Sequence, residues 1–267
     1  MEDIESKNGP STLKMVLFIT GALLILFLVY YLVMGLLSPS RKLAEINQEY
    51  GYKDSEKSKI DERFLNDSAF IAINREKSFY QARVNMAESD SICLALNLPD
   101  STAFLEINGV TVHKIKLSEI KVSKVLRNAD EYAITSMLSV PFIIEDDLST
   151  IRKEPVMIKI APKDTSEYKP DILPDTTRSE PVNYIIYLMG GIRLYIYQNT
   201  NDLEKGRFSV FTFDLNNKLR DVIGNLRSMV GFKVPEYHPY IRLRMQKSDA
   251  RILYRALPKH GMISVFR

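Results

Sequence analysis

Few side chains in this sequence are of the types that carry out nucleophilic, acid–base or metal chemistry. The chain has one cysteine, Cys93, and three histidines, His113, His238 and His260, which lie far apart along the sequence. No histidine has a second ligand at the short spacing of a helix-borne metal site, and a lone cysteine excludes an intrachain disulfide and a cysteine-based zinc site. We therefore expect no metal and no cofactor, and we assign no catalytic residue.

Cys93 lies in the alternating segment SICLALNL, residues 91–98. One face of this segment carries Ile92, Leu94, Leu96 and Leu98. A period of two predicts a β-strand, with Cys93 on the opposite face. Because burial raises the pKa of a thiol and lowers its reactivity, we interpret Cys93 as a strand residue and not as a nucleophile.

The other candidate residues are concentrated near the end of the chain, in His238, Tyr240, Arg242 and Arg244. They precede a predicted helix over 248–257 and a final strand over 262–267. An arginine can bind a carboxylate through two parallel hydrogen bonds, but a strand arginine also commonly pairs with a nearby acid. For Arg242 the nearby acids are Asp249 and Glu236, and both interpretations stay open.

The order of these parts resembles the C-terminal part of the YkuD-type L,D-transpeptidase domain, a family that cross-links bacterial peptidoglycan through a catalytic cysteine. The family motif reads roughly Ser-His-Gly-Cys-x-Arg/Asn, followed by a short helix with Asp-Ala and Leu-Tyr and then a strand. In YHPYIRLRMQKSDARILYRALPKHGMISV, His238 matches the motif histidine, and Ile241 and Arg242 match the residues after the cysteine. The segment 91–121 is similar to the opening hairpin of the family.

The sequence departs from this family at the residues that perform the chemistry. Pro239 replaces the motif glycine, Tyr240 replaces the cysteine, and no histidine occurs between Val182 and Pro235. A phenol with a pKa of about 10 is mostly protonated at neutral pH and does not replace a thiolate. The resemblance therefore implies a domain that has lost acyl transfer and keeps a shallow binding groove formed by His238, Tyr240, Arg242 and Arg244.

A second candidate surface is the row of tyrosines in VNYIIYLMGGIRLYIYQN, a predicted hairpin with Gly190-Gly191 at its tip. Its second arm places apolar residues on one face and Tyr195 and Tyr197 on the other. Outward tyrosines are common on sheets, but they also stack on sugar rings or on a partner protein.

Residues 15–37 form an uncharged apolar run flanked by Lys14, Arg41 and Lys42. About 20 such residues span the hydrocarbon core of a bilayer, and this run is longer than the apolar region of a usual signal peptide. We therefore predict a retained transmembrane helix that contacts the lipid bilayer. We expect a short cytosolic tail and an exported remainder.

The predicted organisation has four parts: a polar tail (1–14), the transmembrane helix (15–37), a juxtamembrane helical linker (38–90) and a β-rich extracytoplasmic domain (91–267). The pair Asn108-Gly109 predicts another hairpin. Further strands are expected over 118–126, 132–144, 156–162 and 206–214, and helices over 74–89 and 216–231. The expected fold class is mainly β with a few helices, a β-sandwich-like α+β domain.

A net charge of +3, with basic residues dispersed among acids, argues against nucleic acid as a partner. An anchor joined to a catalytic frame without its nucleophile predicts a non-catalytic bacterial envelope protein in the inner (cell) membrane, with its bulk in the periplasm. It would bind peptidoglycan or other envelope proteins, for example as a subunit of a secretion or cell-wall assembly. Two alternatives stay open: a peptidoglycan-modifying transferase or hydrolase with an unrecognised nucleophile and His113 or His238 as base, and a carbohydrate-binding module using Tyr195 and Tyr197.

Overall fold

The computed structural model describes residues 12–53, 65, 67–153, 180–199 and 206–267. Its strands form a closed barrel in the order β1-β2-β3-β7-β6-β5-β4-β8. The strands are β1 (Cys93–Asn97), β2 (Thr102–Ile107), β3 (Val110–Val122), β4 (Phe142–Ser149), β5 (Asn183–Leu188), β6 (Ile192–Gln198), β7 (Tyr240–Met245) and β8 (Met262–Phe266). The helices are α1 (Thr12–Tyr50), α2 (Ser68–Ala87), α3 (Lys124–Asn128), α4 (Glu131–Leu138), α5 (Gly206–Val230) and α6 (Lys247–Ala256).

The expected fold class, a mainly β and sandwich-like domain, is wrong. Eight strands close on themselves, so there are no two opposed sheets, and helices hold more of the described residues than strands do. The closure depends on two parallel pairs, β1 with β8 and β6 with β7, while the other neighbours are antiparallel. Closure gives every one of the described strands a neighbour on both sides, as in a barrel without edge strands.

Alternation along the strands fills the barrel interior. Leu94 and Leu96 of β1 join the large core cluster with Leu194 and Ile196 of β6, and all four are buried. The opposite face of β1, which includes Cys93, packs in a separate cluster beneath α2. The predicted two-faced strand at 91–98 is therefore confirmed, and each face is buried against a different element.

Both predicted hairpins are confirmed. Asn108 and Gly109 have φ angles of 49° and 77°, as a two-residue turn between β2 and β3 requires. Gly190 and Gly191 have φ angles of 83° and 77° between β5 and β6. A side chain is disfavoured at such angles, which explains the glycines.

Several predicted strands are helices. The segment 132–144 is α4 followed by β4, 118–126 is the end of β3 followed by α3, and 206–214 lies within α5. The helical start of α4 is stabilised by Asp130, whose carboxylate accepts a hydrogen bond from the Ala133 backbone N–H at 3.1 Å. The predicted strand over 156–162 lies outside the described residues.

The helix α2 packs against the barrel, as expected for the segment 74–89. Phe79 lies against Phe266 of β8, with ring centroids 5.2 Å apart. The Arg83 guanidinium donates two hydrogen bonds to the buried Glu106 carboxylate of β2, at 3.1 and 2.7 Å. A buried carboxylate with a bidentate arginine partner fixes α2 in one position.

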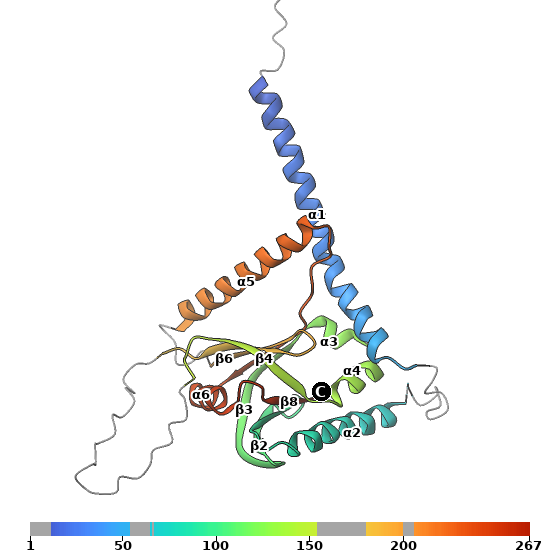
Figure 1. Cartoon of the computed structure of the whole chain (residues 1–267), viewed down its shortest axis with the longest axis vertical. Helices are drawn as coiled ribbons and strands as arrows, with labels where there is room; N and C mark the ends of the chain where they lie inside the picture. Colours follow the sequence, from blue (N-terminus) through green and yellow to red (C-terminus); the bar gives the residue numbers. More distant parts are fainter. Residues whose placement is uncertain (1–11, 54–64, 66, 154–179, 200–205) are drawn as a thin grey trace, which may run out of the picture.

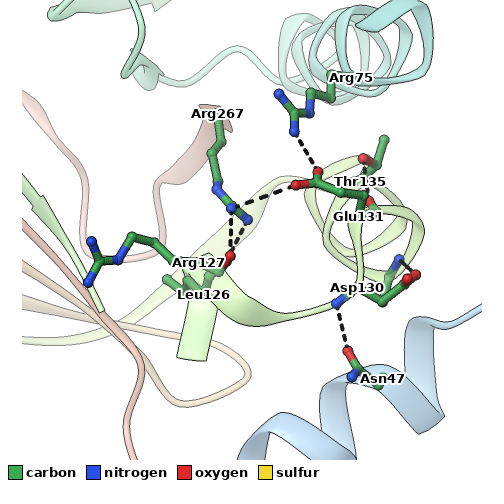
Figure 2. Close-up of polar contacts among 9 residues, drawn as sticks. Asn47, Arg75, Leu126, Arg127, Asp130, Glu131, Thr135 and Arg267 are labelled. Atoms are coloured by element: carbon green, nitrogen blue, oxygen red, sulfur yellow. Dashed lines mark hydrogen bonds and ion pairs between the residues drawn. The ribbon is translucent and has the colours of Figure 1, made fainter. Parts of the chain in front are cut away.

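The helix α1 is joined to the same body at its C-terminal half. The Asn47 side-chain oxygen accepts a hydrogen bond from the Asp130 backbone N–H at 3.0 Å (Figure 2). Next to this bond, the Glu131 carboxylate accepts a hydrogen bond from the Arg75 guanidinium of α2 at 2.6 Å. The Arg267 guanidinium donates hydrogen bonds to the Leu126 and Arg127 carbonyls. Ile46 is also buried in the barrel core cluster. Residues 15–37, in contrast, project away from the barrel (Figure 1).

Among the described residues, one helix is long and apolar enough to cross a membrane, and it is this one. Most of its apolar side chains between Met15 and Leu37 are exposed. The apolar length and the lack of protein cover agree with the predicted span.

Candidate functional site

A cleft of about 710 Å³ lies between the outer face of the barrel, α5 and α1. Strands β6 and β7 supply Tyr195, Tyr240 and Arg242 to its wall, and the segment before β7 supplies His238. Asn217 of α5 and Ser38 of α1 line it from the other side. Figure 1 shows α5 lying across this side of the barrel and reaching α1. We call this hollow the α5 cleft.

Polar contacts between α5 and β6 hold the α5 cleft in shape. The Arg193 guanidinium donates to both carboxylate oxygens of Asp221 at 2.8 Å. The Tyr197 hydroxyl donates to Asp214 at 2.5 Å, and the Asn217 amide donates to the Tyr195 hydroxyl at 3.3 Å. Burial first, and then the bond to Asp214, raises the pKa of Tyr197, so this phenol stays protonated and keeps donating.

Arg242 lies among three aromatic rings in the wall of the α5 cleft. Its guanidinium carbon is 5.7 Å from the ring centroid of Tyr195, 5.4 Å from that of Tyr197 and 6.0 Å from that of Tyr240. Such rings attract a cation electrostatically and hold its orientation. Within the described ranges Arg242 has no hydrogen bond or ion pair, and its Nε is buried without a partner.

The neighbouring acids do not neutralise Arg242 directly. Asp249, one of the two expected partners, instead lies 3.3 Å from the His113 imidazole. Glu119 forms ion pairs with Lys121 at 2.7 Å and with Arg244 at 2.8 Å. The hydrogen bond from Lys121 holds the pKa of Glu119 below its ordinary value, and the charges of Arg244 and Arg242 contribute to this shift.

His238 supports the turn that precedes β7. Its Nδ1 lies 3.2 Å from the carbonyl oxygen of Gly191, so the neutral tautomer with a proton on Nδ1 donates to that carbonyl. Burial, followed by the positive charge of Arg193, lowers the pKa of His238. Both observations give His238 a structural role, joining the segment before β7 to the hairpin tip at Gly191.

Tyr240 lies where two hollows meet. It lines the α5 cleft and also an adjoining hollow of about 560 Å³, which Leu98, Lys121, Arg127 and Arg267 help to form. Its ring is edge-on to that of Tyr195, with centroids 5.9 Å apart. Tyr240 is therefore half-buried at a cleft wall and packed against other aromatic rings.

The structure brings together part of the predicted site. Tyr195, His238, Tyr240 and Arg242 line the α5 cleft, whereas Tyr197 and Arg244 do not. Tyr197 is 1% exposed and stacks beside Tyr195, so these tyrosines do not form an open platform for a sugar ring. Arg244 lies 6.0 Å from the Tyr197 ring and pairs with Glu119.

The residues considered for catalysis lie elsewhere. Cys93 is buried beneath α2, with its sulfur 3.6 Å from the Ser89 hydroxyl. His113, on β3, pairs with Asp249 of α6 and does not line the α5 cleft. In the part of the chain that the structure describes, no group of three or more histidine, cysteine or acidic side chains could hold a metal ion.

Sequence reasoning missed the α5 side of the cleft. Asp214, Asn217 and Asp221 follow one another at helical spacing, so the signal for a single polar helix face was present. The sequence prediction divides this face, because Asp214 falls at the end of a predicted strand and Asn217 and Asp221 fall in the predicted helix 216–231.

No family model, curated protein or solved structure matches this chain. The resemblance to the YkuD-type L,D-transpeptidases stays a prediction.

Proposed function

We propose that this chain is a membrane-anchored, non-catalytic protein of the bacterial envelope. Its barrel lies on the periplasmic side of the inner membrane and binds an anionic group of cell-wall material or of another envelope protein in the α5 cleft. In this proposal Arg242 is the anchor for the anion, and the protein serves as a subunit of a larger assembly.

The observation that supports this proposal is that the Arg242 guanidinium lies at a cleft wall without a hydrogen-bond acceptor among the described residues. Arginine presents donors in a planar fork that matches a carboxylate. In the described structure these donors have no protein acceptor, while three aromatic rings hold the guanidinium at the wall of a cleft. A fixed cation with unused donors beside a hollow is suited to binding an acidic group.

The position of the α5 cleft supports a partner close to the bilayer. Gly35 and Ser38 of α1 contribute to its lining; Gly35 lies two residues before the end of the apolar run, and Ser38 follows it directly. A partner in the cleft would therefore contact the barrel and the membrane-proximal part of α1 together. The stem peptides of peptidoglycan, with their free carboxylates, are one such class of ligand, and the resemblance to transpeptidases favours them.

Sedimentation with sacculi tests the cell-wall form of this proposal. The full chain, reconstituted in nanodiscs, is incubated with purified sacculi, and the bound fraction and any released or altered muropeptides are measured. We expect retention that is weakened about tenfold or more in Arg242→Gln, because a charge-assisted bidentate contact is lost. The matched control is Arg152→Gln, an exposed arginine outside the cleft, which should bind like the wild type.

Three results would count against the cell-wall form. Equal retention of Arg242→Gln and wild type would remove Arg242 from the site. New muropeptide products that disappear in Tyr240→Phe or His238→Ala would make the protein a catalyst. Absence of retention in the wild type would leave only an envelope protein as partner, which crosslinking in cells decides.

A further inference from the structure

The helix α5 presents an apolar face away from the barrel. The large exposed residues on this face include Phe208 (76% exposed), Phe211 (62%), Ile223 (66%) and Val230 (73%). Leu215, Leu219 and Val222 lie between them at steps of three and four residues and are also exposed. One continuous apolar stripe therefore runs along the helix, on a surface that no described part of the protein covers.

This apolar face cannot turn toward the barrel. The opposite face of α5 is fixed to β6 through Asp214, Asn217 and Asp221, by the contacts with Tyr197, Tyr195 and Arg193. Turning the helix over would break all of these bonds and would leave the partially buried Asp221 and Arg193 without each other. The outward direction of the stripe is thus a property of the fold.

The C-terminal end of α5 meets the apolar run of α1. The Tyr30 hydroxyl donates a hydrogen bond to the Met229 carbonyl at 3.1 Å, and the Tyr30 ring lies edge-on to Phe232 with centroids 6.3 Å apart. Tyr30 belongs to the predicted span 15–37, so this end of α5 lies at the level of the membrane. Figure 1 shows α5 running crosswise to α1 from that point, as a helix in the plane of a bilayer would.

We propose that α5 is an interfacial membrane helix whose apolar stripe is buried in the acyl region of the leaflet beside α1. The stripe continues the lipid-facing surface of α1, where Leu32, Val33 and Leu36 are exposed. Exposed cations on and just after α5, Lys218, Arg227 and Lys233, suit the anionic headgroups of such a leaflet. This proposal rests on the span in α1 and is independent of any ligand in the α5 cleft.

An interfacial α5 fixes the barrel at the membrane surface. The helix α5 is bonded to the barrel through β6. The C-terminal half of α1 is attached to the barrel and its helices through Asn47 and Ile46. With two attachments the barrel does not swing on α1, and the α5 cleft stays at the depth of the headgroups.

Spin labels report directly on which medium surrounds the stripe. In a Cys93→Ala background, a nitroxide is attached to Phe211→Cys or Ile223→Cys in the full chain, reconstituted in vesicles of phosphatidylcholine and phosphatidylglycerol. Leu24→Cys in α1 is the lipid reference, and Lys114→Cys on β3 is the water reference. Collisions with oxygen, which partitions into lipid, and with a water-soluble nickel chelate are measured at each position.

We expect labels at 211 and 223 to resemble the label at 24, with a several-fold higher ratio of oxygen to nickel accessibility than at 114. High nickel accessibility at these positions would place the stripe in water and overturn the proposal. Low accessibility to both reagents would also overturn it, because another protein surface, such as a second copy, would then cover the stripe. Leu219→Cys, at a further exposed position on the same face, replaces either variant if it does not fold.

Discussion

At the scale of single residues, the hydrogen bond between Tyr197 and Asp214 should contribute measurably to stability. Tyr197 is buried and donates at 2.5 Å, whereas Tyr187 accepts a bond from Arg220 at an exposed position. Tyr197→Phe should cost about 1–3 kcal/mol, because it removes a bond to a carboxylate in a buried environment. We expect Tyr187→Phe to cost less than about 0.5 kcal/mol. Thermal unfolding followed by circular dichroism measures both, and equal effects would contradict the structural role of this bond.

His238 predicts how the stability of the protein depends on pH. Burial lowers the pKa of His238 below its ordinary value of 6.5, so the folded state favours the neutral imidazole. Its contribution is present above pH 6.5 and is lost as the pH falls toward the lower folded-state pKa, because the unfolded chain takes up the proton first. The midpoint temperature of thermal unfolding should therefore decrease as the pH is lowered below about 6.5.

A substitution isolates the contribution of His238 to this decrease in the midpoint temperature. In His238→Asn, where the amide N–H can replace the Nδ1 donor to Gly191, the fall should be smaller. His260→Asn removes an exposed histidine and should keep the fall unchanged. An identical pH profile in the wild type and His238→Asn would show that this residue is not the cause.

At the scale of elements, two glycine-to-alanine changes should act in opposite directions. Gly191 has a φ of +77°, and a Cβ there would meet Glu236 and His238 at 3.4 Å. Gly191→Ala should destabilise by about 1–2 kcal/mol, because an L side chain is strained in that conformation. Gly224 lies inside α5 with nothing within 4 Å of the added Cβ, so Gly224→Ala should stabilise α5 by about 0.5–1 kcal/mol. Shifts of the same sign in thermal unfolding would contradict the hairpin geometry or the helical state of this segment.

Elements specified by local signals could be predicted from the sequence. Asn108-Gly109 and Gly190-Gly191 supply the positive φ angles that their turns need, and β7, α6 and β8 follow the expected order. The start of α5 could not be read correctly, because Phe211 and Phe213, two residues apart, fit a strand, whereas Phe208 and Phe211, three residues apart, fit a helix. The directions in which these side chains point depend on the barrel and, as proposed, on the bilayer. Local sequence propensity includes neither.

At the scale of the whole molecule, barrel closure could not be predicted. The parallel pairs β1–β8 and β6–β7 join segments with long stretches of chain between them, and alternation alone fits a sandwich equally well. For the same reason the sequence could not show which of the candidate residues lie together. The residues near Tyr240 were found from their order in the chain, but Tyr195 and Asn217 reach them only through the pairing of β6 with β7 and the packing of α5.

Arg242 lies beside three aromatic rings at the wall of a cleft between the barrel, α5 and α1. We propose that this cleft lies at the membrane surface and binds an anionic partner through Arg242. Photocrosslinking in living cells is the most direct test, because it captures a partner of either class. A photoreactive amino acid at Lys218, an exposed position that lines the α5 cleft, leaves Tyr240 and Arg242 intact.

Adducts are identified by mass spectrometry and quantified in the wild-type, Arg242→Gln and Arg152→Gln backgrounds. We expect one dominant adduct with a peptidoglycan fragment or an acidic segment of an envelope protein. Its yield should be reduced about tenfold or more in Arg242→Gln and unchanged in Arg152→Gln. An adduct of equal yield in all three backgrounds, or no adduct from this position, would contradict the claim.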